Sequence, residues 1–153
     1  MPTRARIGGA EEIAVAGDYV LRRQADGTVR AWGSNLQGQF GAQGSADRSM
    51  NRLDLPGRAQ RLAAGAFHAC VPLVDRRVDP VVVCAGGNDV VRSGAWAPVA
   101  GFGGPLVSLR SGDHNVCAVR QGDAAVLCWG GAVIMAPSGL VTRSARPLVM
   151  QVP

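Results

Sequence analysis

The sequence predicts an all-β protein made of repeated units, and three observations lead to this fold class. Its 21 glycines and nine prolines follow no collagen-like period, which is typical of short strands joined by tight turns. No long stretch has the apolar spacing of an amphipathic helix. A glycine-bounded phrase also recurs along the chain at nearly constant intervals, which indicates one supersecondary unit per interval.

The clearest unit opens at Gly17. Two runs rich in β-forming residues, 19–25 and 28–32, flank Asp26-Gly27, a two-residue turn signal. This stretch is expected to form a β-hairpin. A short inner strand at 12–16 precedes it, and a loop with a weaker outer strand follows it.

Two further units follow the same plan. Gly17, Gly65 and Gly112 open the three units and are separated by 48 and 47 residues. Hairpins are expected between 68 and 84 and between 115 and 129, each after a short inner strand. We therefore predict a single domain over 1–153, with repeats at about 12–58, 59–104 and 105–146, and with 147–153 as a lead-in to a further unit or a capping strand.

The composition is that of a folded protein, with 47% hydrophobic and 18% charged residues. The net charge is +5, and all sixteen cationic side chains are arginines, which grip carboxylates and phosphates bidentately. Because these arginines are spread along the chain, nucleic-acid binding is not expected. No apolar run is long enough to span a membrane, and no signal-peptide pattern is visible at the start of this chain.

The first unit carries a family resemblance. Its phrase DGTVRAWGSNLQGQFG at 26–41, with a glycine ten residues before Gly27, resembles the repeat of the regulator of chromosome condensation superfamily. The resemblance covers about residues 12–152 as three imperfect repeats. The third repeat lacks the asparagine and the Gly-Gln-Phe-Gly loop, and the second has Ala85 where the tryptophan should stand. The resemblance implies a β-propeller, whose blades are four-stranded antiparallel sheets.

Three blades do not close a ring, because propellers typically need about 4–8 of them. An incomplete ring leaves sheet faces open, which favours association. We therefore expect a propeller segment that is part of a longer chain, or one that is completed by a protein partner or by further copies.

The four cysteines fall at matching places in the second and third repeats. One of each pair stands five residues after the opening glycine, and the other stands just before the tryptophan position. The repeat thus places the members of a pair on neighbouring strands, within reach of a disulfide. In the first repeat Arg22 and Ala31 stand at these positions, so both cysteines are lost together. We predict two disulfides, Cys70–Cys84 and Cys117–Cys128.

Two alternatives to disulfides remain open from the sequence. The cysteines would be four buried thiols in a reducing compartment, or His68, Cys70 and Cys84 would contribute to a zinc site. Among propellers of the superfamily, paired cysteines resemble the extracellular variant, such as the ectodomains of plant crinkly-type receptor kinases and secreted bacterial proteins. The resemblance implies an extracellular or luminal location, with an intracellular one as the alternative.

No catalytic, cofactor or metal site is expected. His68 falls on the histidine that the superfamily commonly carries, which the resemblance makes a structural residue that bonds to backbone between blades. Val20 fills this position in the first repeat and Asn115 in the third. Ser111, Asp113 and His114 include the residue types of a catalytic triad. Adjacent strand residues point to opposite faces, however, so Asp113 and His114 cannot both face one substrate without a bulge.

The hypothesis that follows is a non-enzymatic propeller segment that serves as a protein-interaction module or as a structural subunit of a larger, extracellular assembly. The alternative is an intracellular regulator of a small GTPase, or a chromatin-binding protein. An exposed aromatic side chain beside arginines is typical of a protein interface. The candidate interface residues are Asp75, Arg76, Arg77, Arg92 and Trp96.

Overall fold

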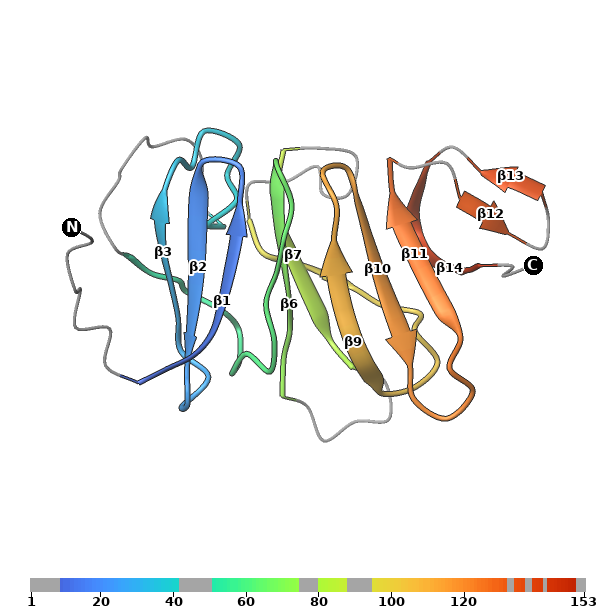
Figure 1. Ribbon diagram of the computed structural model, residues 1–153, viewed down its shortest axis with the longest axis horizontal. Helices are drawn as coiled ribbons and strands as arrows, with labels where there is room; N and C mark the ends of the chain where they lie inside the picture. Colours follow the sequence, from blue (N-terminus) through green and yellow to red (C-terminus); the bar gives the residue numbers. More distant parts are fainter. Residues whose placement is uncertain are drawn as a thin grey trace, which may run out of the picture.

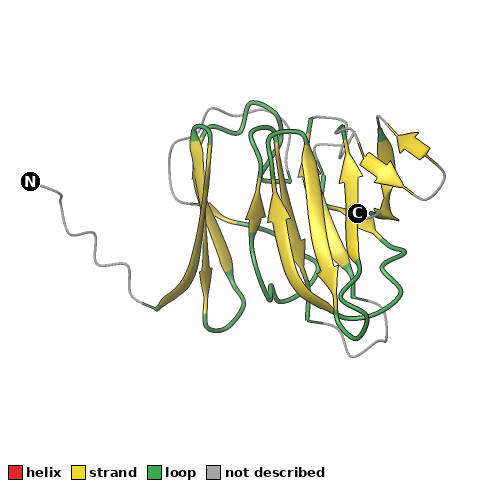
Figure 2. Cartoon of the chain, turned by 45° about the vertical axis from the view of Figure 1, so that its right-hand side comes forward, coloured by secondary structure: helices red, strands yellow, loops and turns green. Residues whose placement is uncertain are grey.

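A computed structural model of the chain describes residues 9–41, 51–74, 80–87, 95–131, 134–136, 139–141 and 143–150. The described residues contain no helix and form three four-stranded antiparallel sheets. The sheets stand side by side in chain order (Figure 1). The view turned by 45° shows the same row of sheets (Figure 2).

The sheets follow the predicted units, and in each the strands pair in sequence order. The first contains β1 (Ala10–Ala16), β2 (Tyr19–Gln24), β3 (Val29–Gly33) and β4 (Asn51–Arg52). The second contains β5 (Ala63–Ala64), β6 (His68–Pro72), β7 (Val82–Gly86) and β8 (Ala97–Val99). The third contains β9 (Leu106–Ser111), β10 (Asn115–Arg120), β11 (Val126–Gly130) and β14 (Ser144–Val149).

A small hairpin is inserted in the chain between the last two strands of the third sheet. Residues 147–149 therefore lie elsewhere than the sequence predicted. β12 (Ile134–Ala136) and β13 (Gly139–Val141) pair only with each other, between β11 and β14. Leu148 and Val149 pair with Cys128 and Leu127, so they belong to the outer strand of the third sheet rather than to a lead-in. The inserted hairpin accounts for the difference, because it delays this strand along the chain. Residues 151–153 lie outside the described part.

Apolar side chains fill the two seams between neighbouring sheets. At the first seam, Tyr19, Leu21 and Val29 of the first sheet pack in one cluster with Val71 and Val83 of the second. At the second seam the cluster joins Val82 and the Cys70 and Cys84 side chains to residues of the third sheet, namely Leu109, Val116, Ala118 and Trp129. Each seam buries side chains of both its sheets, so each sheet is stabilised by its neighbour.

The strand register corrects one detail of the repeat alignment. Tyr19, His68 and Asn115 pair with Gly33, Gly86 and Gly130, three glycines of positive φ that end the third strand of each sheet. Tyr19, and not Val20, therefore occupies the position of His68. The repeat alignment, which matched Gly17 with Gly65, is one residue out. Gly17 lies inside its turn, and the residue before it, Ala16, pairs with Tyr19. Gly65 precedes the corresponding turn and itself bonds to His68, so it corresponds to Ala16.

The same one-residue shift changes which residue of the first sheet corresponds to the first cysteine of each pair. Cys70 pairs with Cys84 and Cys117 with Cys128, and the matching pair of the first sheet is Leu21 with Ala31. The interpretation that placed Arg22 there was wrong. Leu21 and Ala31 are both fully buried at the first seam, so an apolar pair fills the space that a disulfide fills in the other two sheets.

We expect Gly86→Ala to destabilise the fold more than Gly122→Ala. Both glycines have positive φ (140° and 102°), which costs an alanine about 1–2 kcal/mol. A Cβ at Gly86 would also press on the Phe67 carbonyl oxygen and lie 2.7 Å from the Cα of His68, whereas a Cβ at Gly122 meets nothing within 4 Å. Urea unfolding should show Gly86→Ala less stable than Gly122→Ala by about 2 kcal/mol. Equal losses would contradict the close approach at Gly86.

Candidate functional site

A side chain from each of the first two sheets crosses the seam to the next sheet. The Tyr19 hydroxyl donates to two backbone carbonyls of the second sheet's inner turn, 2.8 Å from Gly65 O and 2.6 Å from His68 O. The side chain is buried, and burial raises the pKa of Tyr19, so the hydroxyl keeps its proton. Tyr19 thereby fixes the first sheet to the turn that carries His68.

His68 repeats this arrangement at the second seam. Its Nε2 lies 2.6 Å from the Ser111 Oγ of the third sheet, and the ring is fully buried. Burial, with a smaller contribution from the charge of His114, lowers the pKa of His68 to about 4, so the ring is neutral at pH 7. The side chain contacts a hydroxyl across the seam, where the resemblance implied a bond to backbone.

The residue types of a triad are not arranged as one. The Ser111 hydroxyl is placed to donate to the carbonyls of Gly112 and Asn115, while its oxygen contacts His68. His114 packs instead on the exposed Phe67, with ring centroids 5.3 Å apart. In the described part of the chain, no group of three or more His, Cys, Asp or Glu residues could hold a metal ion.

Both predicted disulfides are present, Cys70–Cys84 and Cys117–Cys128, and they lie in different surroundings. Cys70 and Cys84 are fully buried in the second seam beneath the third sheet. The other pair occupies the equivalent place on the third sheet, where no further sheet of the described chain covers it. Cys117, Val119 and Val126 are half-buried there and Cys128 is buried, and the β12–β13 hairpin lies beyond the third sheet on the side away from the second sheet (Figure 1).

The first sheet also presents apolar side chains outward. Ile13 and Val15 of β1 are 52% and 71% exposed, on the face opposite the one that packs on the second sheet. Trp32 and Val20 lie opposite each other on this outward face, at the place that Trp129 and Val116 hold in the third sheet. At the second seam that same place is buried.

Four of the five candidate interface residues, Asp75, Arg76, Arg77 and Arg92, lie outside the described residues. The fifth, Trp96, is half-buried and packs on the first cluster, with its indole against Gly41. It also lines an apolar pocket of about 520 Å³ together with Pro56, Leu73 and Val83. Trp96 is therefore largely a packing residue, with one side open to this pocket.

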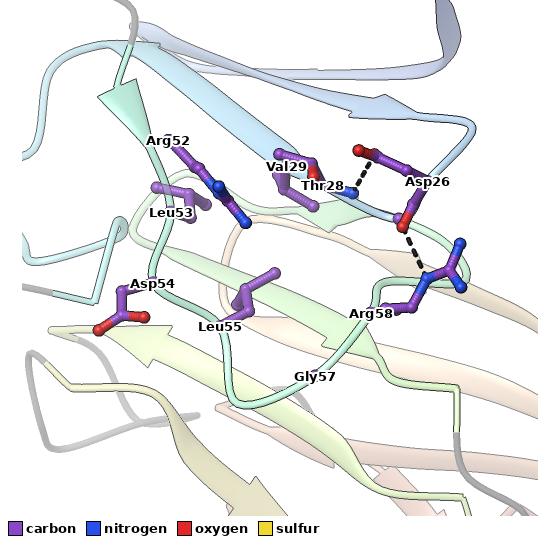
Figure 3. A pocket seen from close by; sticks show the side chains of 10 residues that line it. Asp26, Thr28, Val29, Arg52, Leu53, Asp54, Leu55, Gly57 and Arg58 are labelled. Carbon is purple, nitrogen blue, oxygen red and sulfur yellow. Dashed lines mark hydrogen bonds between the residues drawn. The ribbon is translucent and has the colours of Figure 1, made fainter.

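A second pocket of about 520 Å³ carries charge, and the sequence analysis did not identify it. Its walls are the turn at 26–29 and the segment at 52–58 that leads to the second sheet (Figure 3). Arg58 fixes these walls together, because its Nε donates to the Asp26 carbonyl at 2.7 Å. A further bond joins Ala59 N to Gly27 O. These residues are up to 32 positions apart in the sequence, so no local motif marks the pocket.

Comparison with known proteins gives structural matches only. No family model and no curated protein matches the chain. Human WBSCR16 superposes with a TM-score of 0.73 and 17% identity over 96% of this chain. Prp20p, the RCC1 protein of Saccharomyces cerevisiae, superposes with a TM-score of 0.67 and 18% identity over 94% of this chain. The CRINKLY WD40 ectodomain of the Arabidopsis thaliana receptor kinase ACR4 superposes with a TM-score of 0.50 and 19% identity over 79% of this chain.

These likenesses establish the fold: the chain is built as an RCC1-like β-propeller segment, as the repeats predicted. It spans 39% of the length of WBSCR16 and of Prp20p, and 36% of the ACR4 ectodomain. No helix in the described part of the chain is long and apolar enough to cross a membrane.

We expect acid to weaken the second seam through His68. The pKa of His68 is about 4 in the folded chain and 6.5 in the reference state, so the unfolded chain takes up the proton first as the pH falls. The free energy of unfolding should therefore decrease by about 2 kcal/mol between about pH 6.5 and 4.5 through this group alone. Urea unfolding at several pH values across this range measures the slope.

His68→Gln provides the control, because glutamine does not titrate. The pKa of Asp26 is lowered by its bonds to Thr28, and protonation of that carboxylate reduces stability only at still lower pH. The variant should lose less stability than the wild type over the same pH range, whatever its stability at neutral pH. Parallel slopes for the two proteins would rule out His68 as the acid-sensitive group.

Proposed function

We propose that this chain is a non-enzymatic propeller segment whose function is protein–protein interaction or structural support within a larger, extracellular assembly. The open face of the third sheet carries this proposal. Positions that are buried at the second seam recur on that face around Cys117 and Cys128, without a described sheet above them. A covering blade or partner protein would bury them as the third sheet buries Cys70 and Cys84.

The extracellular location is supported by the cysteines. All four are paired, and disulfides persist mainly in oxidising compartments. The likeness to a plant receptor-kinase ectodomain agrees with this location, although it concerns the fold alone. In such an assembly the chain would provide sheets and loops for contact with a protein ligand.

A second candidate is an intracellular regulator that binds a small GTPase or chromatin. The observation that favours it is the likeness to yeast Prp20p, whose structure is described together with its binding to Gsp1p and histones, and which is also known bound to Kap60. An intracellular location would have to keep two disulfides in a reducing environment, and for this reason we favour the extracellular assembly.

Photo-crosslinking from the open face tests the interaction. A photoreactive residue at Val119, which is half-buried on that face, should crosslink to a second copy or to another protein in cells that make the chain. The matched control is Val71, which is fully buried in the first seam and should crosslink only within the chain. Mass spectrometry identifies the products. A purely intramolecular pattern from Val119 would overturn the proposed interaction.

Thiol alkylation without reduction separates the two compartments. Native chain treated with an alkylating reagent should gain no mass, because all four cysteines are bonded. The same sample alkylated after reduction supplies the control and should gain four labels. Four labels on unreduced chain taken directly from cells would contradict the extracellular assembly and favour the intracellular regulator.

A further inference from the structure

The charged pocket beside the first sheet has cationic groups available for a ligand. Arg52 and Arg58 both line it, and Figure 3 shows them on opposite sides. In the part of the chain that the structure describes, the Arg52 side chain forms no hydrogen bond or ion pair. Arg58 uses only its Nε, on the Asp26 carbonyl. The Arg52 guanidinium and the terminal nitrogens of Arg58 therefore keep donors for an anion.

The carboxylates near the pocket do not neutralise these arginines fully. One oxygen of Asp26 accepts the backbone N–H of Thr28 at 2.8 Å, which closes the turn and lowers the pKa of this carboxyl. Figure 3 shows Asp26 directed at Thr28, and it shows Asp54 turned away from the other charged groups. Asp26 therefore serves mainly to close its own turn.

A further positive charge lies beside Arg52. In the sheet register Arg52 pairs with Arg30 of β3. Like charges directly opposite each other on neighbouring strands are destabilising. An anion bound at Arg52 would relieve this repulsion, so the sheet itself favours a negative ligand at this edge.

The pocket also has an apolar component. Val29 and Leu53 are buried beside it, and Leu55 is half-buried. The walls are held in a fixed geometry, because Gly27 adopts φ +79° and a Cβ there would lie 2.8 Å from the Cβ of Arg58. An apolar group beside the anion would cover the exposed part of Leu55, whereas a small inorganic ion would leave it uncovered.

From these contacts we propose that the pocket binds a carboxylate carried on an apolar group, such as a leucine with a free carboxyl group. Arg52 holds the carboxylate, the terminal nitrogens of Arg58 approach it from the other side, and the apolar group covers Leu55. Two sources supply this chemistry, a small carboxylic acid or the C-terminal carboxylate of a protein partner. The second source deepens the proposed interaction function and rests on it.

Titration of the isotope-labelled chain with N-acetyl-leucine tests the proposal. Saturable shifts are expected at the amides of Thr28 and Leu53 in ¹H–¹⁵N spectra, with a dissociation constant on the order of 1 mM for so small a ligand. N-acetyl-leucinamide, which lacks the carboxylate, should give no saturable shift. Inorganic phosphate should bind more weakly, because it leaves the half-buried Leu55 side chain uncovered. Amide binding, or phosphate binding as tight as that of N-acetyl-leucine, would overturn the carboxylate assignment.

Matched arginine variants locate the site. Arg52→Gln should weaken N-acetyl-leucine binding about tenfold, the loss expected for one charge-assisted hydrogen bond. Arg146→Gln, an exposed arginine of β14 in the third sheet, should bind as the wild type does. Unchanged spectra of Arg52→Gln away from the pocket establish that it folds. Equal binding by the two variants would place the ligand elsewhere and refute the site.

A hexapeptide ending in leucine with a free carboxyl group distinguishes the sources. Affinity at least tenfold above that of N-acetyl-leucine supports a protein C-terminus, and equal affinity supports a small acid. No binding of either probe overturns the pocket proposal. Because crosslinking from Val119 reports on a different face, failure here leaves the interaction function standing. If the Val119 crosslink is absent but the probes bind, the pocket proposal is likewise unaffected.

Discussion

The structure depends on one kind of contact, in which a side chain at the start of a sheet's second strand reaches the inner turn of the next sheet. Tyr19 makes this contact at the first seam through its hydroxyl and His68 makes it at the second through its imidazole. Each group is buried, so an unmade bond would leave carbonyls or a ring nitrogen without water, at a cost of about 1–3 kcal/mol. The contact therefore helps to hold each sheet to the next one.

This contact also explains why different residues serve at the same position. The tyrosine hydroxyl reaches the backbone carbonyls of the next sheet's inner turn directly. The shorter histidine contacts the Ser111 hydroxyl, which is placed to donate to the backbone carbonyls of that turn. The glycines paired with them, Gly33 and Gly86, lie against their Cα atoms, where a Cβ would not fit. The same position of the repeat therefore makes the polar contact across the seam and the close backbone contact within the sheet.

The sequence allowed much of the fold to be predicted, because its signals are local. Asp26-Gly27 marks a hairpin through its own turn chemistry, and the cysteine pairs repeat with the hairpins that hold them. The prediction placed Arg22 where Leu21 stands, and this error has a physical cause. A glycine fits either inside a turn or just before it, and the opening glycines of different repeats take different ones of these two places. The charged pocket could not be predicted, since contacts between residues far apart in the sequence, such as Arg58 with Asp26, bring the segment at 52–58 to the turn at 26–29.

The open face of the third sheet and the docked face of the second sheet hold a disulfide at the same register position. The Cys117–Cys128 face repeats the positions of the Cys70–Cys84 face, and the difference between them is the sheet that covers the latter. Association at such a face would need no new kind of contact, because an added blade would use the packing that already joins the described sheets. The charged pocket differs in origin, since it arises where a turn and a connecting segment meet. Specific recognition can therefore vary there through residues such as Arg52 without disturbing the seams on which the fold depends.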